Sequence, residues 1–178
     1  MKLRRHITVI IFCIISHTVF SQTTGNINVS VSLPIVTLLD IEPAGAIAMN
    51  FTAPTEAGQP VTAPASNTTK WINYTSAIAS GGLTRRITAA VNQTIPGVNI
   101  RLTAATASGA GAGTLGTPTA QVTLTTTATN IITGIGGAYT GNGANNGHRL
   151  TITLAVSSYT NLTSRTNTPI VITYTITE

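Results

Sequence analysis

Apolar and polar residues alternate at every second position along much of this chain, and no segment has a helical period. The clearest case is residues 26–33, Asn-Ile-Asn-Val-Ser-Val-Ser-Leu, which end at Pro34. Two further regular alternations, Leu150–Val156 and Ile170–Ile176, lie near the C-terminus. Because successive side chains of a strand point to opposite faces, these segments predict β-strands with one buried face.

The other predicted strands are short and are separated by segments rich in Gly, Pro, Asn or Thr. Residues 52–69, 109–116 and 134–147 have this composition and predict loops. The pattern predicts an all-β fold, an Ig-like antiparallel β-sandwich of about 8–10 short strands in a single domain over residues 35–178. Besides the three strands above, we expect strands at 35–41, 46–51, 71–74, 86–91, 98–102, 122–124 and 131–132.

The composition agrees with an all-β protein, since 42% of the residues are hydrophobic and only 7% are charged. The surfaces of helices need Lys, Glu, Arg and Gln, whereas this chain is rich in Thr, Asn, Ser, Ala and Gly. So low a charged fraction argues against a helical cytosolic enzyme and against a disordered polyelectrolyte.

The N-terminus has the pattern of a secretory signal peptide over residues 1–21. Lys2, Arg4 and Arg5 precede an apolar run, residues 7–15, and small residues follow before Ser21. A lipoprotein anchored through Cys13 is the alternative, which the bulky Phe12 before it disfavours. No later apolar run approaches the ~18 residues of a membrane span. We therefore expect an exported chain beginning near Gln22, with no cysteine and hence no disulfide.

The formal net charge of +5 gives little support to nucleic-acid binding. Three of the nine basic residues lie in the predicted signal peptide, and the other six, against four acidic residues, leave a net charge of +2. Apart from Arg85-Arg86, these basic residues are scattered singly, without interleaved aromatic residues. We expect no nucleic-acid partner.

Residues able to do catalysis or bind a metal are scarce. His148, the one histidine after residue 21, follows Asn145-Asn146-Gly147 and is expected to be a solvated loop residue. Asp40 and Glu42 alternate along one strand, where a weak cation site or a carboxylate pair is the alternative to solvent-facing strand ends. This inventory predicts no enzyme, no metal and no cofactor.

Two other patterns suggest binding sites only weakly. Residues 111–116 match the dinucleotide fingerprint G-x-G-x-x-G, but Thr-Pro-Thr follows instead of a helix and no acidic residue lies downstream at the required spacing. Trp71 and Tyr74 offer a platform for a glycan, although a single Trp in a sandwich strand is expected in the core. Tyr139 and Tyr159 are dispersed from Trp71 in the sequence.

The predicted strand at 26–33 begins close to the expected new N-terminus, in a segment of residues 22–34. An amphipathic strand that is free at one end can pair with its own sheet or fill a groove in a neighbouring subunit, which is β-augmentation. In the second case Ile27, Val29, Val31 and Leu33 would occupy four successive subsites, and Pro34 would follow them as a hinge. The residues alone leave both alternatives open.

Residues 26–39 resemble the mature start of the major pilins of CS1-type (alternate chaperone–usher) fimbriae. Those pilins begin with an N-I-x-V-x-A-S-like donor strand, then a Pro, then an apolar V-I-x-L-L-like strand. The resemblance implies an Ig-like sandwich, donation of residues 26–33 to the next subunit, and partners that are other copies, a periplasmic chaperone and an outer-membrane usher. It also implies a fimbria on the surface of a Gram-negative bacterium. Leu33 stands where the family has an acid.

The sequence therefore predicts an exported structural subunit of a surface fimbria that polymerises through its N-terminal strand. The alternative is a secreted or surface β-sandwich module that binds carbohydrate or a cell surface, with the N-terminal strand paired in cis. A self-contained structural protein is the third possibility, since the signal peptide and Thr/Asn-rich chain also resemble exported proteins of Bacteroidota.

Overall fold

The computed structural model describes residues 24–178, so the predicted signal peptide, 1–21, lies outside the described residues. Within them the protein is all-β, and no helix is long and apolar enough to cross a membrane. All nine strands belong to the compact unit Pro34–Glu178. They are β1 (Val36–Glu42), β2 (Asn67–Ala77), β3 (Arg85–Val91), β4 (Val98–Ala104), β5 (Ala112–Pro118), β6 (Val122–Thr123), β7 (Thr129–Tyr139), β8 (His148–Val156) and β9 (Ile172–Thr177).

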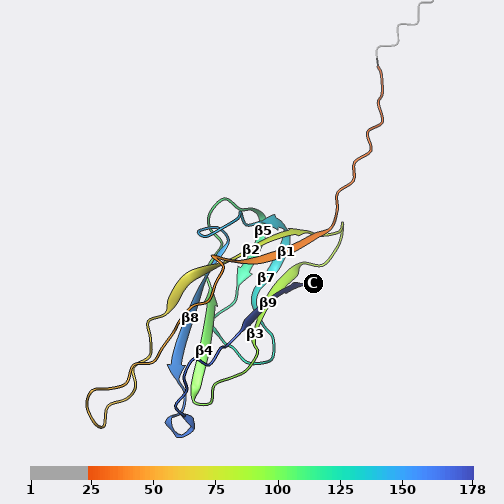
Figure 1. Ribbon diagram of the computed structural model, residues 1–178. Coiled ribbons are helices and arrows are strands. Elements are labelled where there is room, and N and C mark those ends of the chain that lie inside the picture. Colours follow the sequence, from red (N-terminus) through yellow and green to blue (C-terminus); the bar gives the residue numbers. More distant parts are fainter. Residues whose placement is uncertain (1–23) are drawn as a thin grey trace, which may run out of the picture. The chain divides into compact units, whose positions relative to one another are not determined.

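The nine strands form one open antiparallel sheet, in which seven follow the order β6-β4-β8-β2-β7-β3-β9. Figure 1 labels all nine strands except β6. The sheet branches, because β1 pairs with the other edge of β2 and β5 pairs with the other edge of β7. The β2–β7 junction is short and joins Thr75 and Ser76 to Tyr139 and Ala138. The expected all-β class and antiparallel pairing are confirmed, and the Ig-like sandwich stays a prediction.

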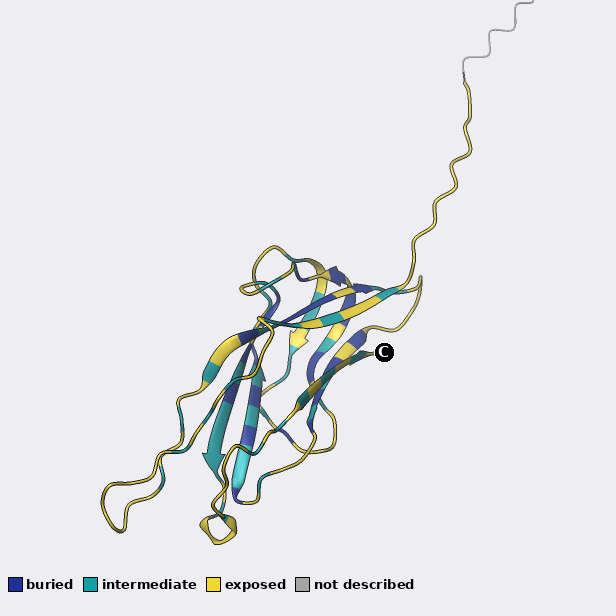
Figure 2. Cartoon of the chain, viewed as in Figure 1, coloured by how far each residue is buried: buried dark blue, intermediate teal, exposed yellow. Residues whose placement is uncertain are grey.

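The core lies on the inward faces of the long strands, which Figure 2 shows as dark blue segments alternating with exposed ones. Alternation explains this arrangement, since every second residue of β3 is buried, from Arg85 to Val91. Aliphatic side chains, chiefly isoleucine, fill the interior. The fully enclosed apolar residues are Ile72, Ile87, Leu102, Ile131, Ile132, Ile135 and Leu150.

Two buried cations, Arg85 and Lys70, hold the two ends of β1. Arg85 Nη1 donates to the Val36 carbonyl at 2.6 Å and to Ser76 Oγ at 3.0 Å. Lys70 Nζ donates to the carbonyls of Pro43 and Gly45, at 2.6 and 2.7 Å. Buried cations need such partners, because burial without hydrogen bonds is costly. These bonds fix where the chain enters β1 and where it leaves.

The expected loops at 109–116 and 134–147 are partly wrong, because β5 and most of β7 lie there. A Cβ on Gly113 or Gly116 would overlap the backbone of β7, and both glycines have positive φ, +91° and +74°. Glycine therefore permits the close approach of β5 to β7 here. The sequence pattern predicted a loop because glycine is common in loops. The G-x-G-x-x-G match falls in β5 and, as expected, opens no helix.

Replacing Ile87 by alanine tests the core. Ile87 is 0% exposed at the centre of β3, so the substitution leaves a cavity and should lower the free energy of unfolding by about 2–5 kcal/mol. The matched control is Leu83→Ala, at a side chain 70% exposed just before β3, which should change stability by no more than about 0.5 kcal/mol. Urea unfolding of both variants measures the difference, and equal losses would contradict this description of the core.

Candidate subunit-interaction site

The four predicted donor side chains lie in an extended segment without a strand partner among the described residues. Ile27, Val29, Val31 and Leu33 are 87%, 75%, 76% and 89% exposed, and Figure 2 shows this segment as exposed throughout. So many aliphatic side chains in water are unfavourable, since each loses about 1.5–3 kcal/mol of burial energy. Pro34, the predicted hinge, is the first residue of the strand-bearing unit.

The strand-bearing unit contains a groove of about 1040 Å³, whose lining combines apolar side chains with polar ones, chiefly residues 163–168, which include Arg165. One wall is the segment 46–53, and the other is the segment 162–170 with the first residue of β9. The inward faces of β4 and β8 form its floor. The apolar side chains that line it include Ile47, Met49, Phe51, Val98, Ile100, Ile152, Leu154, Leu162, Ile170 and Ile172.

The wall at 46–51 has the alternation of a strand but no strand pairing. Ile47, Met49 and Phe51 are half-buried, and the residues between them are exposed. The prediction of a strand at 46–51 is therefore wrong, because these residues form no ladder hydrogen bonds. The predicted alternation of inward and outward side chains is present. Within residues 24–178 no strand pairs with this segment, and its residues line the groove.

Strand β9 leaves the other side of the groove open. It pairs along one edge with β3 and has no partner at its second edge in the part of the chain described. Half of its backbone N–H and C=O groups therefore point away from β3, as at any sheet edge. Its inward residues Ile172, Tyr174 and Ile176 are only half-buried against the core, and burial raises the pKa of Tyr174 above its ordinary value.

The open strip continues on β1, which approaches β9. Leu39 and Ile41 of β1 pack against the core and are only half-buried, as are Ile47 and Met49 beyond them. Arg85 connects the start of β1 to the end of the chain after β9, since it binds the Val36 carbonyl and its Nη2 lies 3.7 Å from Glu178 Oε1. The groove is thus an uncovered stretch of core between two chain segments that have free backbone edges.

The expectation of a solvated loop histidine is wrong for His148. It is the first residue of β8, and it is fully buried. Its Nδ1 lies 2.8 Å from the Ala105 carbonyl, and its Nε2 lies 3.0 Å from Tyr74 Oη and 3.2 Å from the Leu115 carbonyl. Pairing of β8 with β2 and β4 draws the residue inward, and the Asn/Gly composition before it belongs to the preceding turn. His148 therefore connects β8 to β2 and β5.

Asp40 and Glu42 lie on one face of β1, as their alternation predicts, and Asp40 is exposed. No group of three His, Cys, Asp or Glu side chains within residues 24–178 could hold a metal ion. Asp40 Oδ1 instead accepts a hydrogen bond from the Ile41 amide at 2.7 Å.

Trp71 is half-buried and lies outside the core, contrary to expectation, because the adjacent Ile72 and Tyr74 take the inward positions of β2.

Comparison with known proteins gives no match to a family model, to a curated protein or to a solved structure. The sequence raises the alternative of a groove in a neighbouring subunit but does not predict which residues line it. Its signal was the alternating segment 46–51, which the sequence places beside no obvious partner strand.

The buried His148 should make stability depend on pH. Burial lowers its pKa below the ordinary value of about 6.5, and hydrogen bonds to the carbonyls of Ala105 and Leu115 partly oppose this shift. The unfolded chain therefore takes up a proton below about pH 6.5 that the folded chain resists, so stability falls as the pH falls. Unfolding free energies measured without a histidine tag should be lower at pH 5.5 than at pH 7.5.

The His148→Gln variant is the control for this dependence. It should be less stable at pH 7.5, because buried hydrogen bonds are lost, but its stability should vary little between pH 7.5 and 5.5. No other histidine follows residue 21, so no other side chain ordinarily titrates in this range. Equal stability of the original protein at both pH values would contradict the prediction.

Proposed function

We propose that this protein is an exported structural subunit of a surface fimbria, and that each copy donates residues 26–33 to the groove of the next. The observation that carries the proposal is the presence on one chain of two complementary features. One is an exposed segment with four alternating aliphatic side chains, and the other is a groove with an apolar floor between unpaired chain segments. Neither feature is covered within the described chain.

The segment has suitable chemistry for the groove. Residues 27–33 in extended form span about 20 Å, at roughly 3.3 Å per residue. Ile27, Val29, Val31 and Leu33 would face the floor, and Asn28, Ser30 and Ser32 would face water. Burial of four such side chains contributes roughly 6–12 kcal/mol before the cost of ordering the segment, at about 1.5–3 kcal/mol each.

The backbone of the groove walls supports the same occupant. A strand placed between β9 and residues 46–51 has free ladder partners on both sides, because β9 has an open edge and 46–51 has no pairing. The inserted strand would cover the half-buried side chains of β1 and β9. It would also complete an Ig-like sandwich from the open sheet, which the fimbrial resemblance of residues 26–39 implies.

The start of the strand-bearing unit suits a hinge at Pro34. The boundary between the two units falls between Leu33 and Pro34, and Arg85 holds the Val36 carbonyl just beyond it. Proline has no backbone N–H and a fixed φ, so it ends the donated strand. Under this proposal the periplasmic chaperone covers the groove before assembly, the outer-membrane usher assembles the subunits, and the fimbria stands at the cell surface.

Charge placed on either face of the donor segment tests the proposal. Val29→Arg should abolish concentration-dependent oligomers, because an apolar subsite would have to accept a charge. Ser30→Arg, one residue along on the opposite face, should leave oligomers intact. Size-exclusion chromatography with light scattering measures both variants over a range of concentrations. A protein that stays monomeric, or two variants that behave alike, would contradict strand donation in trans.

A mixing experiment separates donor from acceptor. Ile170→Glu places a charge in the groove at a half-buried residue just before β9 and should remove acceptor function while leaving the donor segment intact. Alone, Ile170→Glu and Val29→Arg chains should each stay monomeric, and together they should form a 1:1 dimer. The absence of that dimer from two folded variants would mean that residues 26–33 do not fill this groove.

A further inference from the structure

The outer face of β1, β2 and β7, opposite the core, carries two aromatic residues in a regular array. The register places Leu38, Thr75 and Tyr139 in one row across β1, β2 and β7. Asp40 and Asn73 form the next row, and Glu42, Trp71 and Arg149 form the third. Since positions two apart on a strand share a face, Trp71 and Tyr139 lie on the same face with Asp40 and Asn73 between them.

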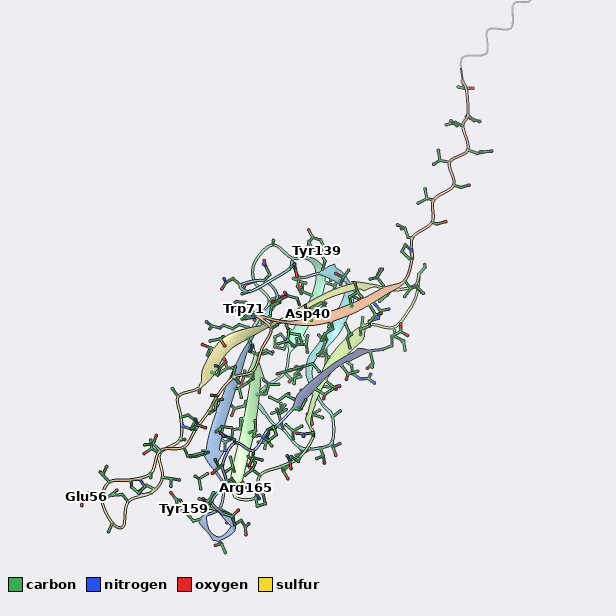
Figure 3. The ribbon with its side chains drawn as sticks, viewed as in Figure 1. Asp40, Glu56, Trp71, Tyr139, Tyr159 and Arg165 are labelled. Carbon is green, nitrogen blue, oxygen red and sulfur yellow. The ribbon has the colours of Figure 1, made fainter. Side chains whose placement is uncertain are left out.

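Part of this face is a shallow depression of about 420 Å³. Its lining includes Leu38, Asp40, Asn73, Thr75, Tyr139 and Asn142. Figure 3 shows Trp71, Asp40 and Tyr139 at one end of the strands, and Tyr159 at the other. Tyr139 is 51% exposed, so much of its ring is open to a ligand.

The turn between β7 and β8 forms a fixed rim for the depression. Asn146 Nδ2 donates to the Asn142 carbonyl at 2.7 Å, and Asn146 Oδ1 accepts from the Ala110 amide at 2.9 Å. Asn73 Nδ2 donates to the Asn146 carbonyl at 2.6 Å and ties this turn to β2. The rim is thus held in place before any ligand binds, which lowers the entropy cost of binding.

The polar groups at this face are acceptors and donors suited to hydroxyl groups. Asn73 is buried, yet its Oδ1 has no hydrogen-bond partner among the described residues. The described residues also give the Asp40 carboxylate no ion pair, so its remaining oxygen is free to accept. Asn73 Oδ1 is enclosed by the protein, so the Asp40 carboxylate, and not this atom, is the acceptor that a ligand hydroxyl group can reach.

We propose that this outer face binds a neutral oligosaccharide, with sugar rings stacked on Tyr139 and Trp71 and a hydroxyl group bonded to Asp40. Aromatic faces carry a negative partial charge, which attracts the polarised C–H groups of a pyranose ring. The combination of apolar rings with a few placed polar groups is typical of small-ligand sites. Strand donation is not required for this binding, because the face lies opposite the core and outside the groove.

Charge decides between ligand classes. Two carboxylates, Asp40 and Glu42, and one cation, Arg149, lie in the array, so an anionic sugar would meet net repulsion. A divalent cation would find too few charged ligands, since no cluster of three metal-binding side chains occurs within residues 24–178. A neutral, hydroxyl-rich chain is the ligand that satisfies both the rings and the acceptors.

Trp71 allows a direct test, because it is the single tryptophan in the protein. The purified protein is titrated with neutral trisaccharides of glucose, mannose, galactose and N-acetylglucosamine, and with matched uronic-acid and sialylated sugars, while tryptophan emission is recorded. At least one neutral sugar should give a saturable change at concentrations up to ~10 mM. Saturation with none of them, or tighter binding of the anionic sugars, would overturn the proposal.

Variants locate the binding. Tyr139→Ala, at a half-exposed side chain, should weaken binding about tenfold or more, whereas Tyr139→Phe should keep it, since the ring and not the hydroxyl group carries the stacking. Tyr159→Ala is the matched control, because Tyr159 is 54% exposed at the other end of the molecule. Asp40→Asn should weaken binding and leave the unfolding temperature unchanged. Equal affinity of the Tyr139→Ala and Tyr159→Ala variants would place the ligand elsewhere.

Discussion

Coverage of the apolar core is the constraint on which this structure depends. Nine strands enclose most of the isoleucine-rich interior of the described residues, but a groove between residues 46–53 and residues 162–172 is left uncovered. Residues 46–51 and the open edge of β9 also have backbone N–H and C=O groups without ladder partners. A single added strand would therefore both cover apolar side chains and pair these backbone groups. Residues 27–33 lack the complementary partner, since their alternating aliphatic side chains are exposed and no sheet buries them within the described residues. The proposed function places the N-terminal strand of one subunit in the groove of the next.

Hydrogen bonds from buried polar residues supply the connections that disulfides provide in many exported proteins. The one cysteine, Cys13, lies in the predicted signal peptide. Arg85 instead links β1, β2 and the C-terminal residue Glu178, and Lys70 holds the chain where it leaves β1. His148 connects β8 to Tyr74 and to the carbonyls of Ala105 and Leu115. These bonds fix the two ends of β1 and the position of β8 against β2.

Much of the fold was predictable because alternation reports directly on strand faces. It located β3, β4, β8 and β9 and the inward residues of 46–51. It failed where tertiary contact overrides local composition: Gly113 and Gly116 look like loop residues but allow β5 to approach β7. His148 and Trp71 were misplaced for a related reason, since the depth of a residue near a strand end depends on its neighbours in the sheet. The array of Trp71 and Tyr139 depends on the register between β2 and β7, distant in sequence, so the two aromatic residues looked dispersed.

Hydrogen exchange of backbone amides, compared between dilute monomer and assembled protein, tests strand donation in trans most directly. The account predicts that the β9 amides facing away from β3, and those of residues 27–33, exchange rapidly in the monomer and become protected together on assembly. Amides of β9 pointing toward β3 should be protected in both states and serve as an internal reference. Protection of residues 27–33 already in the dilute monomer would show pairing in cis. Unchanged exchange at β9 on assembly would show that the polymer contact lies elsewhere, and either result would contradict the account.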